Sequence, residues 1–365
     1  MWTNYCPVSL VAGLGVAQSI VESLPVGNRL LLTTQGAVTR GMVSHLLEDE
    51  DSALWTTKTI SPNPDIGFLD SLSFELKSSN FSCIVAVGGG SVIDSAKVLS
   101  VTIPADEPGV LLSWLRQGAK PEFPSSIPVF CAPTTAGTGA EVTPFATVWD
   151  KACEKKYSLT GRGLFPRMSY LDHSLTVSLP WQETLYSGLD ALSHSFETLW
   201  NKNSTPITET YALKAIELIV EYLPRLKENP NDLEARYWML SASLLAGLAI
   251  SQNRTAIAHA ISYQFTLRWD VPHGLACSFT LPAIIELVER HGAWRSRIPV
   301  SVLDRARQFF RDINLVKHVT QYCSIKDLDR CPPNALGVER AGNFVITLDS
   351  KAQRQLLEKS MSYQN

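Results

Sequence analysis

The chain has 365 residues, 45% of them hydrophobic, with a net charge of −3 and a pI near 6.2. This length can fill two hydrophobic cores, so we expect two domains. A weakly acidic chain has no general attraction for nucleic acid or for an anionic membrane surface, and neither is expected as a partner. The N-terminus lacks a charged segment followed by an apolar stretch, and no segment is apolar enough to span a bilayer, so we expect a cytoplasmic protein.

The first half of the chain has a repeating pattern of short apolar runs. Apolar runs at 29–33, 83–87 and 128–131 alternate with helical stretches and glycine turns. This rhythm predicts βαβ units and a mostly parallel sheet.

Two polar loops follow these apolar runs. The first is Gly88-Gly-Gly-Ser-Val-Ile-Asp-Ser-Ala-Lys97, where glycines would let the backbone approach a phosphate at a helix N-terminus. It is not a GxGxxG fingerprint, and a glycine triplet after a strand can also be only a tight turn. The second, Pro133-Thr-Thr-Ala-Gly-Thr-Gly139, supplies hydroxyls at the same sheet edge, where open α/β sheets bind ligands. Together the two loops indicate a dinucleotide.

The pattern changes near Leu179-Pro180. Beyond this point long segments with helical periodicity dominate, at 208–226, 233–249 and 254–267. We therefore predict a dinucleotide-binding α/β domain at 1–179 and a helical domain at 180–365.

Four residues of the second half have the chemistry of a metal site. Asp190 and His194 lie four apart in a helical segment, so both side chains leave the same face. His259 and His273 are too distant to share a turn with them, but the fold could bring them in. A single His or Asp on a helix is more often a partner in the fold than a ligand, whereas one carboxylate with three imidazoles suits Fe(II) or Zn(II). A cofactor on the first domain and a metal on the second would meet in a cleft between them.

Cysteine usage indicates reduced thiols. The seven cysteines are an odd number without a CxxC pair, in a chain too large to need disulfides. Cys277 follows His273 by one turn if a helix continues there, and we expect it to pack as a small apolar residue beside the site.

Four motifs resemble those of the iron-dependent (group III) alcohol dehydrogenases, over nearly the whole chain. They are Gly88-Gly-Gly-Ser-Val-Ile-Asp-Ser-Ala-Lys97, Pro133-Thr-Thr-Ala-Gly-Thr-Gly-Ala-Glu-Val-Thr143, Gly188-Leu-Asp-Ala-Leu-Ser-His194 and Pro272-His-Gly274. The resemblance implies the dehydroquinate synthase-like fold, with a Rossmann-like N-terminal domain and an all-α metal-binding C-terminal domain. It also implies a homodimer or larger homo-oligomer.

The resemblance also implies site residues. Asp190, His194, His259 and His273 would bind Fe(II) or Zn(II). The residues that would contact NADPH or NADH are Gly88, Gly89, Gly90, Ser91 and Asp94 near the pyrophosphate, then Thr134, Thr135, Thr138, Thr143 and Lys156, and Asn63 by a weaker match.

Three positions depart from the family pattern. Thr34 stands where many relatives have an acidic residue that binds the adenosine ribose, so nothing there repels the 2′-phosphate of NADPH. Tyr263 replaces a histidine four residues after His259; its hydroxyl could pass a proton or could only fill space. The turn before His259 is Asn253-Arg-Thr255, where relatives usually have small apolar residues.

Arg254 in this turn suggests an anionic substrate. A guanidinium buried near a metal ligand loses hydration, which is costly unless an anion pairs with it. A salt bridge to an acidic side chain or a solvent-facing position would also accommodate Arg254. The segments 132–150, 155–158 and 254–259 look like a branch of the family, the phosphonoacetaldehyde reductases. That branch implies NAD(P)H-dependent reduction of a small anionic aldehyde, phosphonoacetaldehyde, to 2-hydroxyethylphosphonate. The alternatives are a dehydrogenase of an uncharged short-chain alcohol or diol, and a lyase of the same fold.

Overall fold

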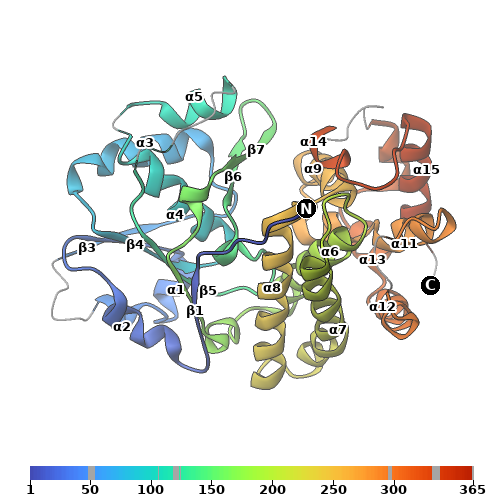
Figure 1. Ribbon diagram of the computed structural model, residues 1–365, viewed down its shortest axis with the longest axis horizontal. Helices are drawn as coiled ribbons and strands as arrows, with labels where there is room; N and C mark the ends of the chain where they lie inside the picture. The colour runs from blue at the N-terminus through green and yellow to red at the C-terminus, as the bar shows by residue number, and fades with distance from the viewer. Residues whose placement is uncertain are drawn as a thin grey trace. The chain divides into compact units, whose positions relative to one another are not determined.

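The computed structural model describes residues 1–47, 54–105, 107–117, 123, 125–294, 298–330 and 338–363. The chain divides into an α/β unit, Cys6–Thr135 with Gly139–Leu179, and a helical unit that contains Pro180–Asn365 (Figure 1). The short segments Met1–Tyr5 and Ala136–Thr138 also belong to the helical unit, which the division at 179 and 180 did not anticipate. One reason is that the backbone of Tyr5 exchanges two hydrogen bonds with the side-chain amide of Gln252, at 3.0 and 2.9 Å.

The α/β unit is built on a parallel sheet of six strands. Their order is β1 (Ser9–Ala12), β8 (Met168–Leu171), β5 (Val129–Pro133), β4 (Cys83–Gly88), β2 (Arg29–Thr33) and β3 (Trp55–Thr59). Every residue of β2, β4 and β5 is buried, because helices cover both faces of a parallel sheet. The predicted parallel sheet is confirmed, and the three predicted apolar runs correspond to these central strands.

Alternating side chains of the central strands supply two cores. Leu30 and Leu32 of β2 pack with residues of α3 (Ile66–Leu76) and α4 (Gly90–Thr102). Leu31 points to the other face and packs with η1 (Val16–Ser23) and α2 (Ser44–Leu47). The unit also contains α1 (Gln35–Thr39), α5 (Val110–Arg116) and an antiparallel pair, β6 (Phe145–Asp150) with β7 (Lys155–Thr160).

A buried lysine joins α4 to the loop that follows β5. The ammonium of Lys97 donates to the carbonyl of Thr143 at 2.8 Å, to its hydroxyl at 3.1 Å and to the carbonyl of Phe145 at 2.9 Å. One turn earlier, the carboxylate of Asp94 accepts a hydrogen bond from the backbone N–H of Thr147 at 2.8 Å. These contacts hold the two predicted cofactor loops on one rigid support.

Glu141 provides a prediction about pH. Its side chain is buried, Oε1 has no hydrogen-bond partner among the described residues, and burial raises its pKa from 4.5 to about 6. A carboxyl whose pKa is raised by folding contributes stability that is complete below pH 4.5 and is lost as the pH rises through about 6. Glutamine mimics the protonated form, so Glu141→Gln should stabilise the chain by about 2 kcal/mol at about pH 8 and by less at about pH 5. Thermal unfolding of both proteins at the two pH values tests this prediction. The same difference in the free energy of unfolding at both pH values would contradict it.

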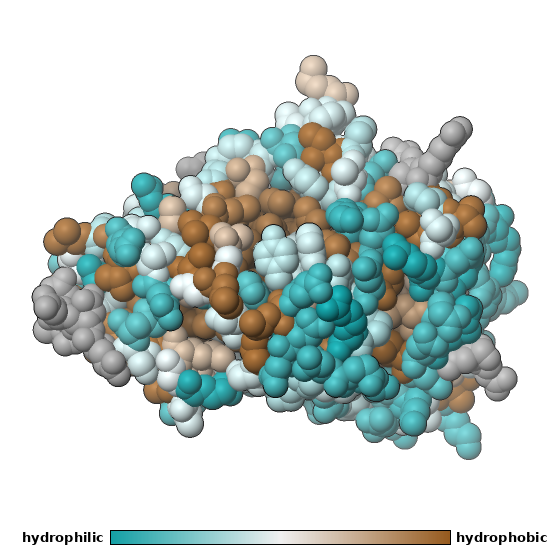
Figure 2. All heavy atoms as spheres, turned by 90° about the horizontal axis from the view of Figure 1, so that it is seen from below, coloured by the Kyte–Doolittle hydropathy of each residue, from teal (hydrophilic) through white to brown (hydrophobic). Residues whose placement is uncertain are grey.

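The helical unit carries ten described α-helices and the 3-10 helix η7 (Ile325–Arg330). The α-helices are α6 (Trp181–Leu199), α7 (Pro206–Glu228), α8 (Leu233–Asn253), α9 (Ile257–Trp269), α10 (His273–Ser278), α11 (Leu281–Arg290), α12 (Val300–Ile313), α13 (Leu315–Val319), α14 (Val338–Ala341) and α15 (Ser350–Met361). Among the described residues, no helix has both the length and the apolarity needed to cross a membrane. On the face shown in Figure 2, hydrophobic side chains gather between hydrophilic ones, which is common on folded proteins.

The predicted helix at 254–267 was wrong at its start. Helix α8 continues to Asn253, and Arg254 then adopts a φ of 61°, which no α-helix accommodates. Helix α9 begins only at Ile257. The break leaves residues 254–256 as a short turn between the two helices, directly after Asn253.

Candidate functional site

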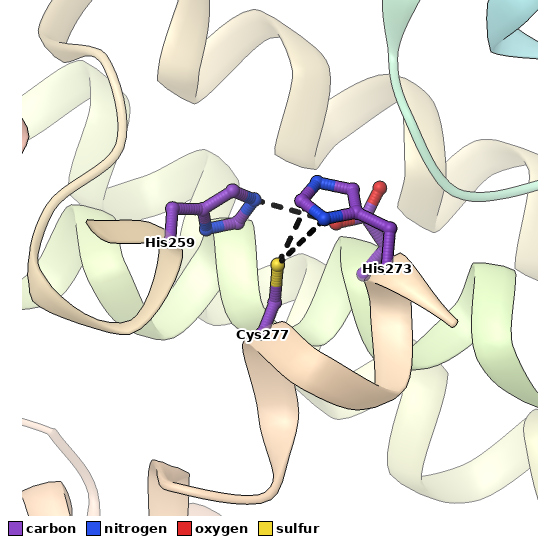
Figure 3. Close-up of side chains that lie close together, drawn as sticks. His259, His273 and Cys277 are labelled. Atoms are coloured by element: carbon purple, nitrogen blue, oxygen red, sulfur yellow. Dashed lines mark hydrogen bonds and ion pairs between the residues drawn. The ribbon is translucent and has the colours of Figure 1, made fainter. Parts of the chain in front are cut away.

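Three helices of the helical unit bring together four side chains that could hold a metal ion. Asp190 comes from α6, His259 from α9, and His273 and Cys277 from α10. One donor atom from each lies within 4.8 Å of every other, and all four side chains except His273 are buried. Figure 3 shows the rings of His259 and His273 and the sulfur of Cys277 facing one another.

The spacing of these donors fits a divalent metal. Two ligand atoms about 2.1 Å from one tetrahedral ion lie about 3.4 Å apart, or about 3.6 Å if one of them is sulfur. The distance from Asp190 Oδ1 to His259 Nε2 is 3.4 Å, which matches this spacing. The sulfur of Cys277 lies beside the ring of His273, 3.5 and 3.6 Å from its two nitrogens. Asp190 Oδ1 and His259 Nε2 are buried without a hydrogen-bond partner among the described residues. A buried acceptor left in this state is costly, and a cation would satisfy it.

His194, the fourth expected ligand, lies at the edge of this cluster. Its Nε2 is 3.6 Å from Asp190 Oδ1, and its ring stacks on that of His259 with centroids 4.8 Å apart. It is not in the group whose donors all lie within 4.8 Å, where Cys277 is found instead. The distance to Asp190 is nevertheless that of two ligands of one ion, so His194 remains an expected ligand.

The histidines keep Asp190 ionised. Burial raises the pKa of this carboxyl, but the nearby His194, His259 and His273 outweigh burial and hold the pKa well below its usual range. The site therefore keeps an anionic oxygen beside imidazole nitrogens, and carboxylate with imidazole is a combination that borderline divalent metals bind.

Glu197 orients His259, and the sequence analysis did not identify it. Its carboxylate is fully buried on α6 and accepts three hydrogen bonds: from His259 Nδ1 at 2.6 Å, from the N–H of Ala258 at 2.6 Å and from the N–H of His259 at 3.1 Å. Burial opposes ionisation of Glu197, but His259 and the backbone donors hold its pKa low, so Nδ1 is the donor to Glu197 and Nε2 is the nitrogen that faces Asp190 and is left for a metal. The spacing of Asp190, His194 and Glu197 along one helix face was the available signal.

Gly274 allows α10 to approach α6. A Cβ at this position would lie 1.8 Å from the carbonyl oxygen of Tyr186 and 3.3 Å from the Cβ of Asp190. Only glycine fits between these backbones, so the Pro272-His-Gly274 motif brings His273 to Asp190.

A second group of polar side chains lies around Tyr263, which is one turn after His259 on α9. The guanidinium of Arg340 is 5.7 Å from the centre of the Tyr263 ring and donates a hydrogen bond to the hydroxyl of Thr255. Burial raises the pKa of Tyr263, while Arg340 and His259 oppose that rise. Arg340 is far from the other site residues in the chain, and no sequence pattern pointed to it.

Arg254 and its neighbours lie in the turn before α9. The carbonyl of Arg254 accepts a hydrogen bond from Asn201 at 3.0 Å, and its side chain is half-buried. The side-chain amide of Asn253 is buried, and neither its nitrogen nor its oxygen has a hydrogen-bond partner among the described residues. A positive φ at a non-glycine residue costs about 1–3 kcal/mol, and such strain concentrates at functional sites.

The predicted phosphate loop leaves little room for side chains at its glycines. A Cβ at Gly88 would meet Val92 at 2.5 Å, and one at Gly89 would meet Thr135 at 3.2 Å. Gly90 begins α4, so free N–H groups of the first turn lie beside this loop.

The other expected cofactor residues gather at the same sheet edge. The N–H of Thr134 donates to the carbonyl of Gly88 at 3.0 Å, because β4 and β5 are neighbours. The N–H of Asn63 donates to the hydroxyl of Ser91 at 3.2 Å, and Asn63 has a φ of 52°.

Further candidates have structural partners of their own. Asp94 and Thr143 make the buried contacts described above. The hydroxyl of Thr34 accepts from the first turn of α1 at 3.0 Å, and the ammonium of Lys156 lies 5.3 Å from the ring centre of Trp149. Thr138 belongs to the helical unit. No ligand position is assigned by these contacts, so the cofactor roles stay predictions.

Comparison with known proteins identifies the family. Sequence models of iron-containing alcohol dehydrogenases match residues 7–173, and models of the C-terminal region of Fe-containing alcohol dehydrogenases match residues 184–322. Choline dehydrogenase from Bacillus subtilis is 33% identical over 77% of this chain and 71% of its own length. The chain belongs to the iron-containing alcohol dehydrogenases. The predicted family and fold are thereby confirmed, and the family is one of oxidoreductases.

Two further relatives bear on the substrate. Phosphonoacetaldehyde reductase from Streptomyces viridochromogenes is 36% identical over 58% of this chain and 55% of its own length, so the match spans about half of that relative. The crystal structure of sulfoacetaldehyde reductase from Bifidobacterium kashiwanohense, in complex with NAD+, has a TM-score of 0.88 and 27% identity, covering 99% of both chains.

Proposed function

We propose that the protein reduces a small anionic aldehyde, phosphonoacetaldehyde, to 2-hydroxyethylphosphonate with NADPH or NADH and a divalent metal, Fe(II) or Zn(II). The observation that carries this proposal is the Arg340 guanidinium beside Tyr263, one turn from His259. Arg254 in the strained turn before α9 adds a second cation to the same region of the chain. Planar guanidinium groups suit the oxygens of a phosphonate or sulfonate.

The names of two relatives are consistent with an anionic substrate. Phosphonoacetaldehyde and sulfoacetaldehyde are both two-carbon aldehydes with an anionic group, and enzymes named for them are similar to this chain over much or all of its length. Choline is a cation, and two arginines near the site would disfavour it.

The residues of the chain have separable roles in this reaction. When bound, the metal supplies a Lewis acid beside the carbonyl oxygen, and the nicotinamide supplies the hydride. Asp190, His194, His259 and His273 would hold the metal. Arg340 and Arg254 would bind the anionic group and orient the carbonyl, which lowers the entropic part of the barrier.

Other residues of the chain would serve the product and the cofactor. The hydroxyl of Tyr263 is a candidate proton donor to the alcohol product. The loop at Gly88 and the N-terminus of α4 would receive the pyrophosphate, and Thr34 would tolerate a 2′-phosphate.

The second candidate is a dehydrogenase of an uncharged alcohol. NAD-dependent methanol dehydrogenase from Bacillus methanolicus is 34% identical over 57% of this chain and 54% of its own length. This reading predicts no role for either arginine in substrate affinity.

Arg340→Met tests the proposal. Because a charge-assisted hydrogen bond is worth about 1.5–3 kcal/mol, the KM for phosphonoacetaldehyde should rise by roughly 10- to 100-fold, while the KM for propanal should change little. Oxidation of NADPH and NADH, followed by absorbance with metal-loaded protein, measures both. Arg268→Met is the matched control, since Arg268 lies on α9 and its guanidinium contacts only Gln264 and the carbonyl of Arg330 among the described contacts.

Three results would count against the proposal. Equal kcat/KM for phosphonoacetaldehyde and propanal in the unchanged protein would favour the uncharged-alcohol reading. The same loss of affinity for both aldehydes in Arg340→Met would assign Arg340 a structural role. An absence of net cofactor oxidation with every aldehyde would return the chain to the lyase reading.

A further inference from the structure

Cys277 occupies the position of a metal ligand. Its side chain is fully buried on α10, one turn after His273. Its sulfur lies within 4.8 Å of the donor atoms of Asp190, His259 and His273 (Figure 3). The expectation that Cys277 is an apolar neighbour of the site does not account for a sulfur inside the ring of donors.

A simple hydrogen bond explains this position poorly. The sulfur is almost equally distant from the two ring nitrogens of His273, at 3.5 and 3.6 Å. The lone pairs of the two nitrogens diverge in the ring plane, so a sulfur midway between them is aligned with neither. An S–H···N contact with His273 would also leave Asp190 Oδ1 and His259 Nε2, which lie 3.4 Å apart, with no other partner among the described residues.

A shared metal accounts for the cluster as a whole, because it explains why one donor atom each from Asp190, His259, His273 and Cys277 lies within 4.8 Å of every other. The ring of His273 would have to turn one nitrogen toward the ion, since its two nitrogens are now almost equally distant from the sulfur. A sulfur about 2.3 Å and a nitrogen about 2.1 Å from one tetrahedral ion are about 3.6 Å apart. The ion would also satisfy Asp190 Oδ1 and His259 Nε2, which lie 3.4 Å from each other.

We propose that Cys277 is a thiolate ligand of the metal and that it makes the site prefer Zn(II) to Fe(II). The inference rests on the proposed function, which requires a divalent metal at this site. Thiolate is a soft donor that selects zinc among the metals an Asp and His site accepts. Zinc can expand from four to five ligands, so a thiolate does not require the loss of His194.

The test uses Co(II) as a spectroscopic probe of the site. Thiolate bound to Co(II) gives an intense near-ultraviolet charge-transfer absorption, which carboxylate and imidazole ligands do not. The unchanged protein loaded with Co(II) should show this absorption. Cys277→Ser and Cys277→Ala should lose it and keep the weaker visible bands of bound Co(II), because the other ligands remain. Cys323→Ser is the matched control: Cys323 is buried in the same unit, its sulfur contacts the carbonyl of Val319, and the absorption should persist.

Metal affinity gives a second readout. In competition with a chelator, Cys277→Ser should lose roughly 10-fold or more of its affinity for Zn(II) and less of its affinity for Fe(II). X-ray absorption of the zinc-loaded, unchanged protein should show a sulfur neighbour at about 2.3 Å, and this measurement needs no variant to fold.

The possible failures are distinguishable. If Co(II) binds without the charge-transfer absorption, or if the absorption survives in Cys277→Ser, Cys277 is not a ligand while the metal site stands. If the unchanged protein binds neither Co(II) nor Zn(II), both the ligand role of Cys277 and the proposed function fail.

Discussion

Replacing Glu197 by glutamine is expected to weaken metal binding by roughly 10- to 100-fold while leaving the start of α9 formed. The carboxylate of Glu197 accepts three hydrogen bonds, two from backbone N–H groups and one from His259 Nδ1. Glutamine offers one oxygen. If that oxygen accepts from the backbone, the amide NH2 faces Nδ1 and forces the proton of His259 onto Nε2, where the metal should bind. The measurement is metal affinity by chelator competition, together with the tautomer of His259 by NMR.

The alanine variant separates the two roles of Glu197. Helix α9 has no side-chain cap of its own at Ala256, so Glu197 from α6 serves as its cap. Glu197→Ala should therefore lose metal affinity and also destabilise the metal-free protein by about 2–4 kcal/mol, because two buried N–H groups lose their acceptor. Ser195→Ala is the control: its buried hydroxyl bonds only to the carbonyl of Ala191 within α6. Unchanged metal affinity in Glu197→Gln would show that Glu197 supports the fold and not the site.

Patterns that are local in the chain predicted the α/β unit well. Strand β2 at Arg29–Thr33 is apolar on both faces, since Leu31 packs in one core and its two leucine neighbours pack in the other. A short apolar run bounded by turn residues is typical of a strand buried on both faces, which requires helices on both sides of the sheet. The loop at Gly88 was recognisable for a similar reason, because a strand, a glycine run and a helix follow each other without interruption.

Contacts between distant segments could not be predicted in the same way. Arg340 meets Tyr263 across more than seventy residues, and neither residue carries a periodic signal for the other. Cys277 was predicted to be a small apolar residue, because buried free cysteines usually serve only to pack the core. Its position among the donors depends on how α10 packs against α6, which is set by the glycine that precedes it by three residues. At Arg254 a local pattern was misleading. Its helical periodicity predicted that Arg254 belongs to a helix, but in the folded chain Arg254 has a positive φ that breaks the helix.

Replacing Gly274 by alanine is expected to abolish high-affinity metal binding and to lower the stability of the helical unit. The added Cβ would lie 1.8 Å from the carbonyl oxygen of Tyr186 and 2.7 Å from its carbonyl carbon. Both are backbone atoms of α6, so no side-chain rotation relieves the clash, and α10 must move away by more than about 1 Å. His273 precedes Gly274 directly and would move with it, away from Asp190 on α6. Metal sites tolerate displacements of only about 0.5 Å, so the ligand set would be broken.

Gly188→Ala is the matched comparison, because it also adds a methyl group at a closely packed glycine, here on α6 itself. Its Cβ would meet only the ends of flexible side chains, Leu223 at 2.8 Å and Met239 at 3.0 Å, which can rotate away. Overpacking of this kind costs about 1–3 kcal/mol, and the metal affinity should stay near that of the unchanged protein. Thermal unfolding with and without Zn(II) measures both quantities: the shift on adding metal should vanish in Gly274→Ala and persist in Gly188→Ala. A normal metal-dependent shift in Gly274→Ala would mean that α10 does not bring a ligand to Asp190, and the proposed ligand set would have to be abandoned.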